Sequence, residues 1–417
     1  MESISVAGID VHKQMLAVVV GRQGMDEKQW ERRKSGSTTQ ELLHVMAWLQ
    51  QKQVKEVAME STAQYWKPVW IALESHFTLH LAQARSTKGP SGRKSDFRDA
   101  VRIVKRLLSD DLTLSYVPDA EQRQWRLLTR CRHQLTRDRI RLRNQIEGLL
   151  EEGQIKLSSI VSDLLGVSGY RMLKALAAGE SDPKKLAAMG EKRLRATEEE
   201  LAEALTGRLE PMHRKLLALF LKRLDLVEEQ IEDLSKQISK AMAAHQPVMM
   251  RLCGLPGIGA EAPAQIIAEL GPEAAAFPSA AQVASWVGSC PGREESAGES
   301  HNNRSPKGNR PMRRLLNQLA WAAVKTKESY FQGLFRRLVP KLGIKKAIWA
   351  VANRLLKVIW KMLHQKVDYI EFGPLATNEQ ARKKRKQRLV RELRRLGYTV
   401  QISLLPPPLI PTPEPRP

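Results

Sequence analysis

Short apolar runs separated by polar turns occupy the first 115 residues, and most of them alternate with stretches of helical periodicity. Runs of this length are typical of strands, whereas the longer amphipathic stretches between them indicate helices. The pattern predicts strands near residues 6–10, 16–20, 54–59 and 78–84, and helices near residues 40–50, 66–75 and 96–108. Strands followed by mixed strands and helices predict an α/β domain over residues 1–115.

Apolar residues recur every seven positions in two later segments. The more regular seam consists of Leu217, Phe220, Leu224, Val227, Ile231, Leu234 and Ile238. An earlier and weaker seam consists of Leu128, Leu135, Leu142 and Leu149, and it is interrupted by Arg132 and Arg139. These heptads predict two long helices that pair as an antiparallel coiled-coil arm. The arm would occupy residues 116–247, with a helical insertion at about 155–212, and ordinary core helices in a bundle are the alternative.

A third, mainly helical domain is expected over residues 248–375. It opens on a glycine-rich turn, Gly254-Leu-Pro-Gly-Ile-Gly259, which an apolar helix follows. This pattern predicts a helix-hairpin-helix-like element whose exposed N–H groups suit a phosphate, and a simple turn between helices is the alternative. A basic tail is expected over residues 376–417, with a disordered Pro-rich end from Pro406.

The charge balance changes the picture, because 68 Lys and Arg against 45 Asp and Glu give a formal net charge of +23. Such an excess indicates an anionic partner, and phosphate neutralisation makes nucleic acid the expected one. A membrane surface is the alternative, although the chain has no run of about 18 apolar residues and no signal-peptide pattern. The three cysteines form no zinc spacing and are expected to be reduced thiols in the cytoplasm.

Four acidic residues are the candidate chemical groups of the first domain. Asp10 and Glu60 each end an apolar strand, where an ionised acid is costly unless it lies in a turn or binds a metal. Asp96 and Asp99 lie three positions apart and share a helix face, for which N-terminal capping is the alternative role. Carboxylates suit Mg²⁺, or Mn²⁺, and such ions activate phosphoryl transfer. The placement of the acids therefore predicts a metal site.

Ser296 is the candidate nucleophile of the third domain, in a small-residue loop that basic residues follow. A hydroxyl among cations can attack a phosphodiester while arginines stabilise the developing charge. Ser289, Ser300 and Ser305 compete for this role, and a plain turn residue is the alternative. The residues expected to contact nucleic acid are Arg93, Lys94, Arg130, Arg137, Arg141, Arg304, Lys307, Asn309, Arg310, Arg313 and Arg314.

Several stretches resemble the DEDD transposases of insertion sequences, most closely the IS1111 subgroup of the IS110 family. Three of these stretches contain the acids: Ala7-Gly-Ile-Asp-Val-His-Lys13, Met59-Glu-Ser-Thr-Ala-Gln-Tyr-Trp-Lys-Pro-Val-Trp70 and Gly92-Arg-Lys-Ser-Asp-Phe-Arg-Asp-Ala100. The others are Lys156-Leu-Ser-Ser-Ile-Val-Ser-Asp-Leu-Leu-Gly-Val-Ser-Gly169, Phe277-Pro-Ser-Ala280, Glu295-Ser-Ala-Gly298 and Lys307-Gly-Asn-Arg310. Together they cover nearly the whole chain except its tail.

The resemblance implies a RuvC-like RNase H fold for the first domain, with metal ligands at Asp10, Glu60, Asp96 and Asp99. It implies that Ser296 is the nucleophile of a C-terminal transposase domain and that the site is shared between subunits of a homodimer or homotetramer. It also implies a structured non-coding guide RNA that pairs with donor and target DNA, in the bacterial cytoplasm at the nucleoid. One departure is Glu299, where many relatives carry a basic residue.

The expected function is therefore an RNA-guided DNA recombinase that cuts and rejoins strands through a phosphoserine intermediate. Two alternatives from other classes stay open. One is a nuclease of the Holliday-junction-resolving type that uses water as its nucleophile. The other is a non-catalytic RNA- or DNA-binding protein that uses the RuvC-like fold as a scaffold.

Overall fold

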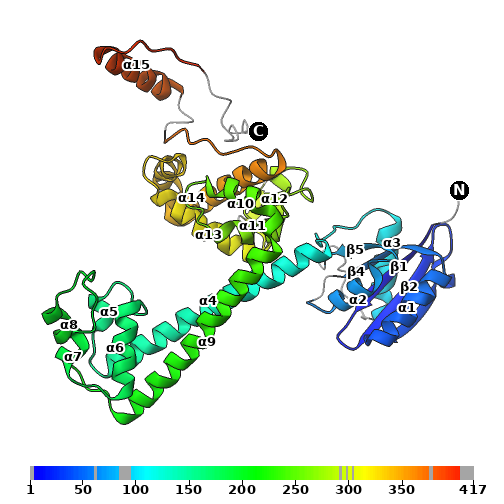
Figure 1. Cartoon of the computed structure of the whole chain (residues 1–417). Coiled ribbons are helices and arrows are strands. Elements are labelled where there is room, and N and C mark those ends of the chain that lie inside the picture. Colours follow the sequence, from blue (N-terminus) through cyan, green and yellow to red (C-terminus); the bar gives the residue numbers. More distant parts are fainter. Residues whose placement is uncertain are drawn as a thin grey trace. The chain divides into compact units, whose positions relative to one another are not determined.

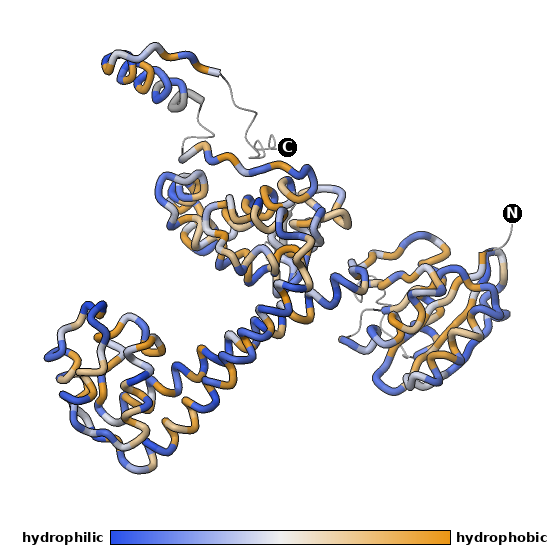
Figure 2. Tube along the Cα trace, in the orientation of Figure 1, coloured by the Kyte–Doolittle hydropathy of each residue, from blue (hydrophilic) through white to orange (hydrophobic). Residues whose placement is uncertain are grey.

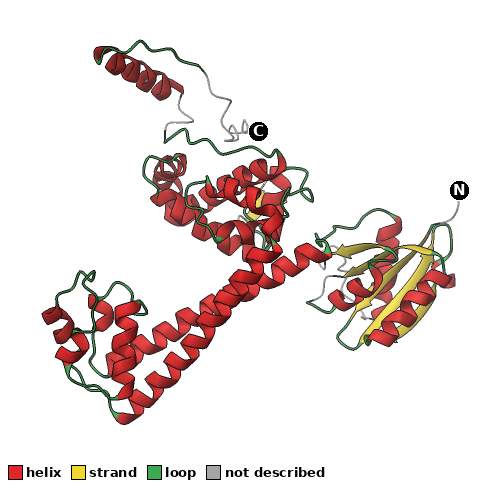
Figure 3. Cartoon of the chain, viewed as in Figure 1, coloured by secondary structure: helices red, strands yellow, loops and turns green. Residues whose placement is uncertain are grey.

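The computed structural model divides the chain into two compact units, Met1–Pro118 and Asp119–Pro417 (Figure 1). It describes residues 4–60, 63–83, 95–290, 294–296, 299–302, 305–374 and 379–403. Strands are concentrated in the first unit, and helices dominate the second (Figure 3). The expectations for Arg93, Lys94, Arg304 and the Pro-rich end from Pro406 lie outside the described residues.

The first unit is built on a five-stranded mixed sheet with the strand order β3-β2-β1-β4-β5. The strands are β1 (Ser5–Val11), β2 (Met15–Arg22), β3 (Glu31–Gly36), β4 (Val54–Glu60) and β5 (Thr78–Ala82). β2 is antiparallel to both β1 and β3, whereas β4 is parallel to both β1 and β5. Helices α1 (Thr39–Gln51) and α2 (Trp66–Leu73) make the crossovers that parallel strands require. The strands and helices predicted for this region are confirmed.

The apolar pattern does not predict β3, and the composition of this strand explains why. Its sequence Glu-Arg-Arg-Lys-Ser-Gly has no apolar alternation, and its side chains are exposed or half-buried. The strand is held by backbone pairing with β2, from Met15 opposite Gly36 to Val20 opposite Glu31. Charged side chains on such an edge strand also disfavour pairing with another sheet.

Helices cover both faces of the sheet, because alternate residues of a strand point to opposite sides. Ala7, Ile9 and Val11 pack in the core with α1 and α2, whereas Val6 packs with α3 (Asp96–Leu108). The helix α3 lies close against β1, and Gly8 permits this approach. A Cβ atom at Gly8 would lie 2.5 Å from the carbonyl oxygen of Ala100.

Replacing Gly8 by alanine is expected to lower the free energy of unfolding by roughly 1–3 kcal/mol, because overpacking pushes backbone segments apart. The added Cβ would meet backbone atoms of α3 rather than one flexible side chain. Chemical denaturation measures the change. Gly148→Ala is the matched control, since nothing lies within 4 Å of its added Cβ; in its helix alanine should stabilise by about 0.5–1 kcal/mol. Wild-type stability in Gly8→Ala would contradict the close approach.

Two long helices of the second unit, α4 (Ala120–Glu152) and α9 (Pro211–Ala241), pack against each other. Arg132 Nε donates to Ser235 Oγ (2.7 Å), and Arg139 Nε donates to Glu228 Oε1 (2.9 Å). The partner's number falls as the arginine's number rises, so the helices are antiparallel. The two arginines that interrupt the first seam therefore join the helices.

Apolar and polar stretches alternate along both long helices (Figure 2). The predicted seam residues are buried or half-buried in the structure: Leu128, Leu135, Leu142, Leu149, Leu217, Phe220, Leu224, Val227, Ile231, Leu234 and Ile238. This confirms which faces of the helices pack inward. The assignment of the pair as a coiled-coil arm stays a prediction, as do the expected domain limits.

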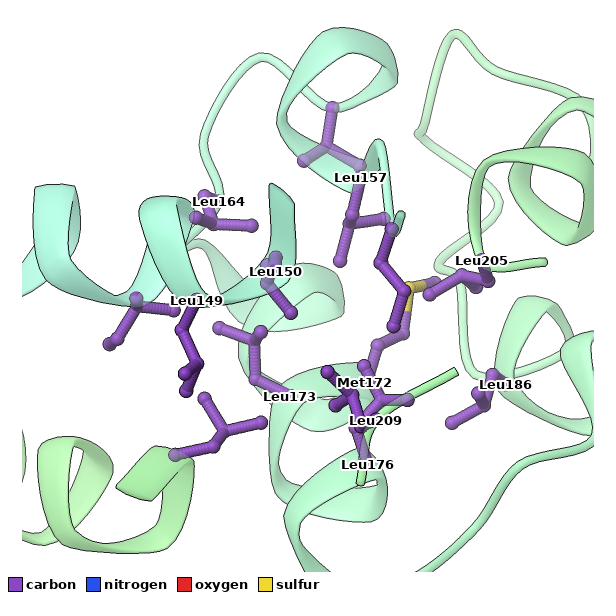
Figure 4. Packing of buried hydrophobic residues seen from close by; sticks show 14 of the residues in the cluster. Leu149, Leu150, Leu157, Leu164, Met172, Leu173, Leu176, Leu186, Leu205 and Leu209 are labelled. Carbon is purple, nitrogen blue, oxygen red and sulfur yellow. The ribbon is translucent and has the colours of Figure 1, made fainter. Parts of the chain in front are cut away.

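Four short helices lie between α4 and α9 in sequence: α5 (Leu157–Ile160), α6 (Val167–Ala178), α7 (Pro183–Ala187) and α8 (Glu198–Ala204). Helices this short are unstable alone in water, so packing must hold them. They enclose one leucine-rich core with the adjoining ends of α4 and α9. Figure 4 shows Leu149 and Leu150 of α4 pointing toward Leu173 and Met172 of α6.

The rest of the second unit is mainly helical, as predicted. Its helices are α10 (Gln246–Cys253), α11 (Ala262–Leu270), α12 (Ala280–Val287), α13 (Arg310–Lys325), α14 (Tyr330–His364) and α15 (Glu379–Arg395). A hairpin of β6 (Glu294–Ser296) and β7 (Glu299–Asn302) lies between α12 and α13 in sequence. In the described part of the chain, no helix combines the length and apolar character needed to cross a membrane.

The predicted glycine-rich turn joins α10 and α11 and has a packing role. Gly257 has a φ of +84°, which favours glycine, and a Cβ there would overlap the backbone of Ala323 in α13. The turn therefore packs against α13. Phosphate binding by its N–H groups stays a prediction.

Candidate functional site

Asp10 is the last but one residue of β1 and Glu60 is the last residue of the neighbouring parallel strand β4, and both point to the same face of the sheet. Ile9 of β1 pairs with Met59 of β4, which makes Asp10 and Glu60 the next residues in this register. Ile9 and Met59 lie in the core with α1 and α2. By strand alternation, the two acids point to the opposite face, which α3 covers.

The first turn of α3 supplies the other two predicted acids, Asp96 and Asp99. Negative charge is favoured there because it compensates the dipole at the helix N-terminus. The close approach of α3 to β1 at Gly8 and Ala100 places this turn near the end of β1. A local preference and a long-range contact thus act together to bring the acids of α3 toward Asp10.

Asp10 is the buried centre of the acidic group, with 8% of its surface exposed. Burial raises the pKa of Asp10, the charge and hydrogen bond of His12 lower it, and the charges of Asp99 and Glu60 raise it. The structure therefore brings Asp99 and Glu60 within electrostatic reach of Asp10. Like charges gathered around a buried carboxylate are unfavourable by themselves, and a cation relieves that repulsion.

His12 is a site residue that the sequence pattern did not indicate. Its Nε2 atom lies 3.1 Å from Asp10 Oδ2 and 3.6 Å from Asp96 Oδ1. The spacing in the sequence could have indicated this residue. His12 follows Asp10 by two positions, and side chains two positions apart in an extended chain point to the same side. The histidine links the acid of β1 to an acid of α3.

A divalent cation fits this group of residues. Asp10, His12 and Asp96 each offer one ligand atom, and these atoms lie within 4.8 Å of one another. The outer acids already attract positive side chains: Lys34 Nζ lies 3.5 Å from Asp96 Oδ2, and Arg102 donates to Asp99 Oδ1 (2.7 Å). Several carboxylate oxygens around one point are the donor set that hard divalent cations prefer.

Ser296 is the last residue of β6 and pairs with Glu299 of β7. Among the serines that compete for the role of nucleophile, the structure distinguishes Ser289 by its burial and its hydrogen bonds. Ser289 is buried, its hydroxyl donates to the carbonyl of Ala284 (3.3 Å), and it accepts from Asn353 Nδ2 (3.3 Å). Ser289 is thus bound within the fold, whereas Ser305 is exposed.

Arg313 ties together the two ends of the loop that carries Ser296. Its guanidinium donates to the carbonyl of Gly288, just after α12, and to that of Pro306 (2.8 Å), just before α13. The guanidinium carbon also lies 4.7 Å from the ring centroid of Trp349. Arg313 was expected to contact nucleic acid, but in the fold its guanidinium donates hydrogen bonds to the two backbone carbonyls at the ends of this loop.

Two family models match the chain. A model for DEDD transposases of the IS110 type, described as "Transposase", matches residues 7–154, and one described as "Transposase IS116/IS110/IS902 family" matches residues 249–336. The chain belongs to the IS110 family of transposases. The first matched segment of this transposase contains all four acids, and the second contains Ser296.

Similar curated proteins have transposase names. A "Probable family 20 transposase" of Pseudomonas aeruginosa is 26% identical, over 75% of this chain and 85% of the relative. The "Putative transposase y4rJ" of Sinorhizobium fredii is 28% identical, over 70% of this chain and 72% of the relative. The transposase of insertion sequence element IS1111A of Coxiella burnetii is 25% identical, over 66% of this chain and 68% of the relative.

Solved structures of Thermus thermophilus RuvC are also similar to this transposase. One, in complex with a Holliday junction substrate, covers 27% of this chain and 99% of its own, with 14% identity and a TM-score of 0.20. The other covers 27% of this chain and 100% of its own, with 15% identity and a TM-score of 0.21.

Apart from Arg313, the described residues of the transposase that were predicted to contact nucleic acid fall into three groups. Arg130 and Asn309 are used inside the fold, because both donate to the buried carboxylate of Glu269, and Asn309 also caps α13. Arg141 forms an exposed ion pair with Asp138 (2.7 Å). The remaining described candidates are exposed or half-buried: Arg137, Lys307, Arg310 and Arg314. Nucleic-acid contact by any of them stays a prediction.

Proposed function

We propose that this transposase cuts and rejoins DNA by metal-dependent phosphoryl transfer, with Asp10, Glu60, Asp96 and Asp99 as the ligands of a RuvC-like RNase H fold. The observation that carries the proposal is the buried Asp10 carboxylate surrounded by other acids and His12. The raised pKa of Asp10 shows that the fold disfavours its charged form. An arrangement that opposes its own ionisation is typical of functional sites.

When bound, Mg²⁺ or Mn²⁺ would polarise the scissile phosphate and stabilise the charge that develops on it. The protein holds the ligands in place for this purpose. His12 orients the carboxylate of Asp10 through their 3.1 Å contact, and α3 presents Asp96 and Asp99 from its first turn. Positioning by packed elements rather than by loops favours precise phosphoryl transfer.

Ser296 is the proposed nucleophile. Its Oγ would form a bond to phosphorus while the bond from phosphorus to the DNA 3′ oxygen breaks. The serine proton would pass to a base or to solvent, and the leaving 3′ oxygen would take up a proton. The resulting phosphoserine ester keeps the phosphodiester energy, so that a free DNA 3′ hydroxyl can later displace the serine without ATP. The match of the second family model across residues 249–336 supports this role.

The proposal extends to the partners. The net charge of +23 supports a large phosphate-bearing ligand, and we assign it as DNA together with a structured guide RNA. The acids lie in the first unit and Ser296 in the second, which is consistent with a composite site in a homodimer or homotetramer. Sequencing the RNA that co-purifies with the protein tests the guide. Recovery of only unrelated cellular RNA would contradict it.

A trapping assay tests the chemistry. The full-length protein is incubated with DNA of its element ends, the co-purified RNA and Mg²⁺, then denatured and examined for protein bound covalently to DNA. We expect an adduct with Mg²⁺ or Mn²⁺ and none with a chelator or with Ca²⁺ alone. Cleaved DNA without any adduct would instead support a nuclease that uses water. Bound DNA that is never cleaved under any condition would support a non-catalytic binding protein.

A further inference from the structure

Three basic side chains share one face of α4, because Arg130, His133 and Arg137 are spaced by three and four positions. This face is joined to the start of α13 through a buried carboxylate. Arg130 donates from Nε to Glu269 Oε1 (2.8 Å) and from Nη2 to Glu269 Oε2 (2.9 Å). Asn309 Nδ2 donates to the same Oε2 atom (2.9 Å), and this residue caps α13. Glu269 of α11 therefore holds α13 beside the basic face of α4.

Arg314 of α13 adds a further cation to this group. Burial lowers the pKa of Arg314, and the positive charges of Arg137 and Arg130 lower it further. The carboxylate of Glu269 partly offsets these effects, because its negative charge raises the pKa. Burial also lowers the pKa of His133 to about 4, with the charges of Arg314 and Arg137 contributing. Arg130 of α4, Glu269 of α11 and Arg314 of α13 line one small pocket, which places the side chain of Arg314 beside this face of α4. The cluster thus combines neighbouring positive charges from two helices.

The carboxylate of Glu269 is the negative charge beside this cluster, and other residues already bind it. The carboxylate of Glu269 is shared by Arg130 and Asn309, and Arg126 Nε lies 3.5 Å from its Oε2. In the part of the chain that the structure describes, neither Arg137 nor Arg314 forms an ion pair. The cluster therefore has an excess of positive charge that the fold itself does not balance.

Two buried polar atoms of the cluster, Arg314 Nε and His133 Nε2, have no hydrogen-bond partner among the described residues. Buried polar groups are rarely left in this state, because each loses its hydration without compensation. An incoming cation would add to the repulsion between the arginines. An oxyanion removes it and accepts hydrogen bonds at the same time.

We infer that Arg137, Arg314 and His133 form a seat for one phosphodiester group of a nucleic acid, referred to below as the α4–α13 phosphate seat. The inference rests on the proposed function for the ligand being a nucleic acid. A guanidinium offers paired donors that match phosphate oxygens. Burial and the charges of Arg314 and Arg137 lower the pKa of His133, and an anion would offset those charges. Arg130 lies outside the seat because Glu269 already engages its donors.

Binding measurements with Arg137→Gln and Arg314→Gln test the seat. Fluorescent duplex DNA and a fluorescent structured RNA are titrated with full-length protein between about 50 and 200 mM salt. We expect each variant to bind at least one of them roughly tenfold more weakly. Loss of one phosphate contact should also reduce the salt slope by about 0.9 for duplex DNA, or about 0.7 for single strands. The matched control is Arg208→Gln, an exposed arginine paired with Glu210 (3.0 Å) and not among the predicted nucleic-acid contacts, which should change affinity less than twofold.

The two ligands distinguish the source of the phosphate. Weakening confined to RNA assigns the seat to the guide, and weakening confined to DNA assigns it to the substrate. Unchanged affinity and salt slope for both ligands in both variants would overturn the inference. The proposed chemistry is judged separately by the covalent adduct, which a failed seat does not remove.

Thermal melting distinguishes a loss of phosphate binding from a loss of folding. Removing one of several like charges should preserve or raise the melting temperature of Arg137→Gln, whereas a structural arginine would lower it on removal. Inorganic phosphate, compared with chloride at equal ionic strength, should raise the melting temperature of the wild type more than that of either seat variant. Equal phosphate effects in all proteins, together with a lowered melting temperature of Arg137→Gln, would assign these residues a structural role and overturn the seat.

Discussion

Asp10→Asn is expected to abolish DNA cleavage while making the metal-free protein more stable. The substitution keeps the shape of the side chain but removes the carboxylate at the centre of the acidic group. Loss of a metal ligand removes several kcal/mol of transition-state stabilisation, so the cleavage rate should fall by roughly 10³-fold or more. In the absence of metal, the same change removes the cost of burying a charged carboxylate and the repulsion from Asp99 and Glu60, and the free energy of unfolding should rise by about 1 kcal/mol.

Two measurements check this prediction: single-turnover cleavage of element-end DNA, and thermal melting with a chelator or with Mg²⁺. Mg²⁺ should raise the melting temperature of the wild type, because a ligand that binds only the folded state stabilises it. It should leave Asp10→Asn unchanged. The matched control is Asp111→Asn, an exposed acid beyond the end of α3, which should alter neither quantity. A variant that is less stable without metal would show that Asp10 serves the fold rather than the metal.

Ser296→Ala is the second change with a large expected effect. The variant should form no covalent adduct, and strand cleavage should fall by roughly 10³-fold or more, because the nucleophile of the first step is missing. Binding of DNA and RNA should stay within about twofold of the wild type, since one hydroxyl contributes little to a surface of many phosphate contacts. The measurement is adduct formation and cleavage under the same conditions, with binding determined separately.

The control for Ser296→Ala is Ser305→Ala, because Ser305 is an exposed serine of the same loop. It should keep both the adduct and the cleavage rate. Ser289→Ala is a poorer control, since its buried hydroxyl is bonded to Ala284 and Asn353, and its loss should reduce stability. Cleavage at the full rate by Ser296→Ala, with no adduct in either protein, would replace the recombinase proposal by hydrolysis with water.

Much of the local structure of the first unit was predictable, because its signals are local. The apolar runs of β1, β2 and β4 follow from alternation along a strand, and the start of α3 at Asp96 follows from charge preferences at a helix N-terminus. The acids at strand ends were recognisable for the same reason. β3 was not predictable, because it is held by the backbone of β2 rather than by an apolar pattern of its own.

The basic residues show the limit of this approach. A count of arginines along α4 and α13 treats them alike, yet Arg130 contacts Glu269, which is 139 residues away in sequence. Arg313 similarly bonds to Gly288 across 25 residues. Whether a guanidinium is bonded within the fold depends on which acceptors tertiary packing brings near it. The periodicity of the sequence does not indicate those acceptors, because they lie far away along the chain.

By itself, then, the sequence predicted most strands and helices of the first unit, supplied the four acids and Ser296 as candidate site residues, and carried the family resemblance that the matching models confirmed. These features depend on residue type and short spacing. Only the tertiary structure decided that His12 joins Asp10 to Asp96, that Arg130 and Arg313 are engaged within the fold, and that Arg314 lines one pocket with Arg130 and Glu269. Each of these is a contact between elements, and the energy of such a contact exists only once the helices and the sheet have packed.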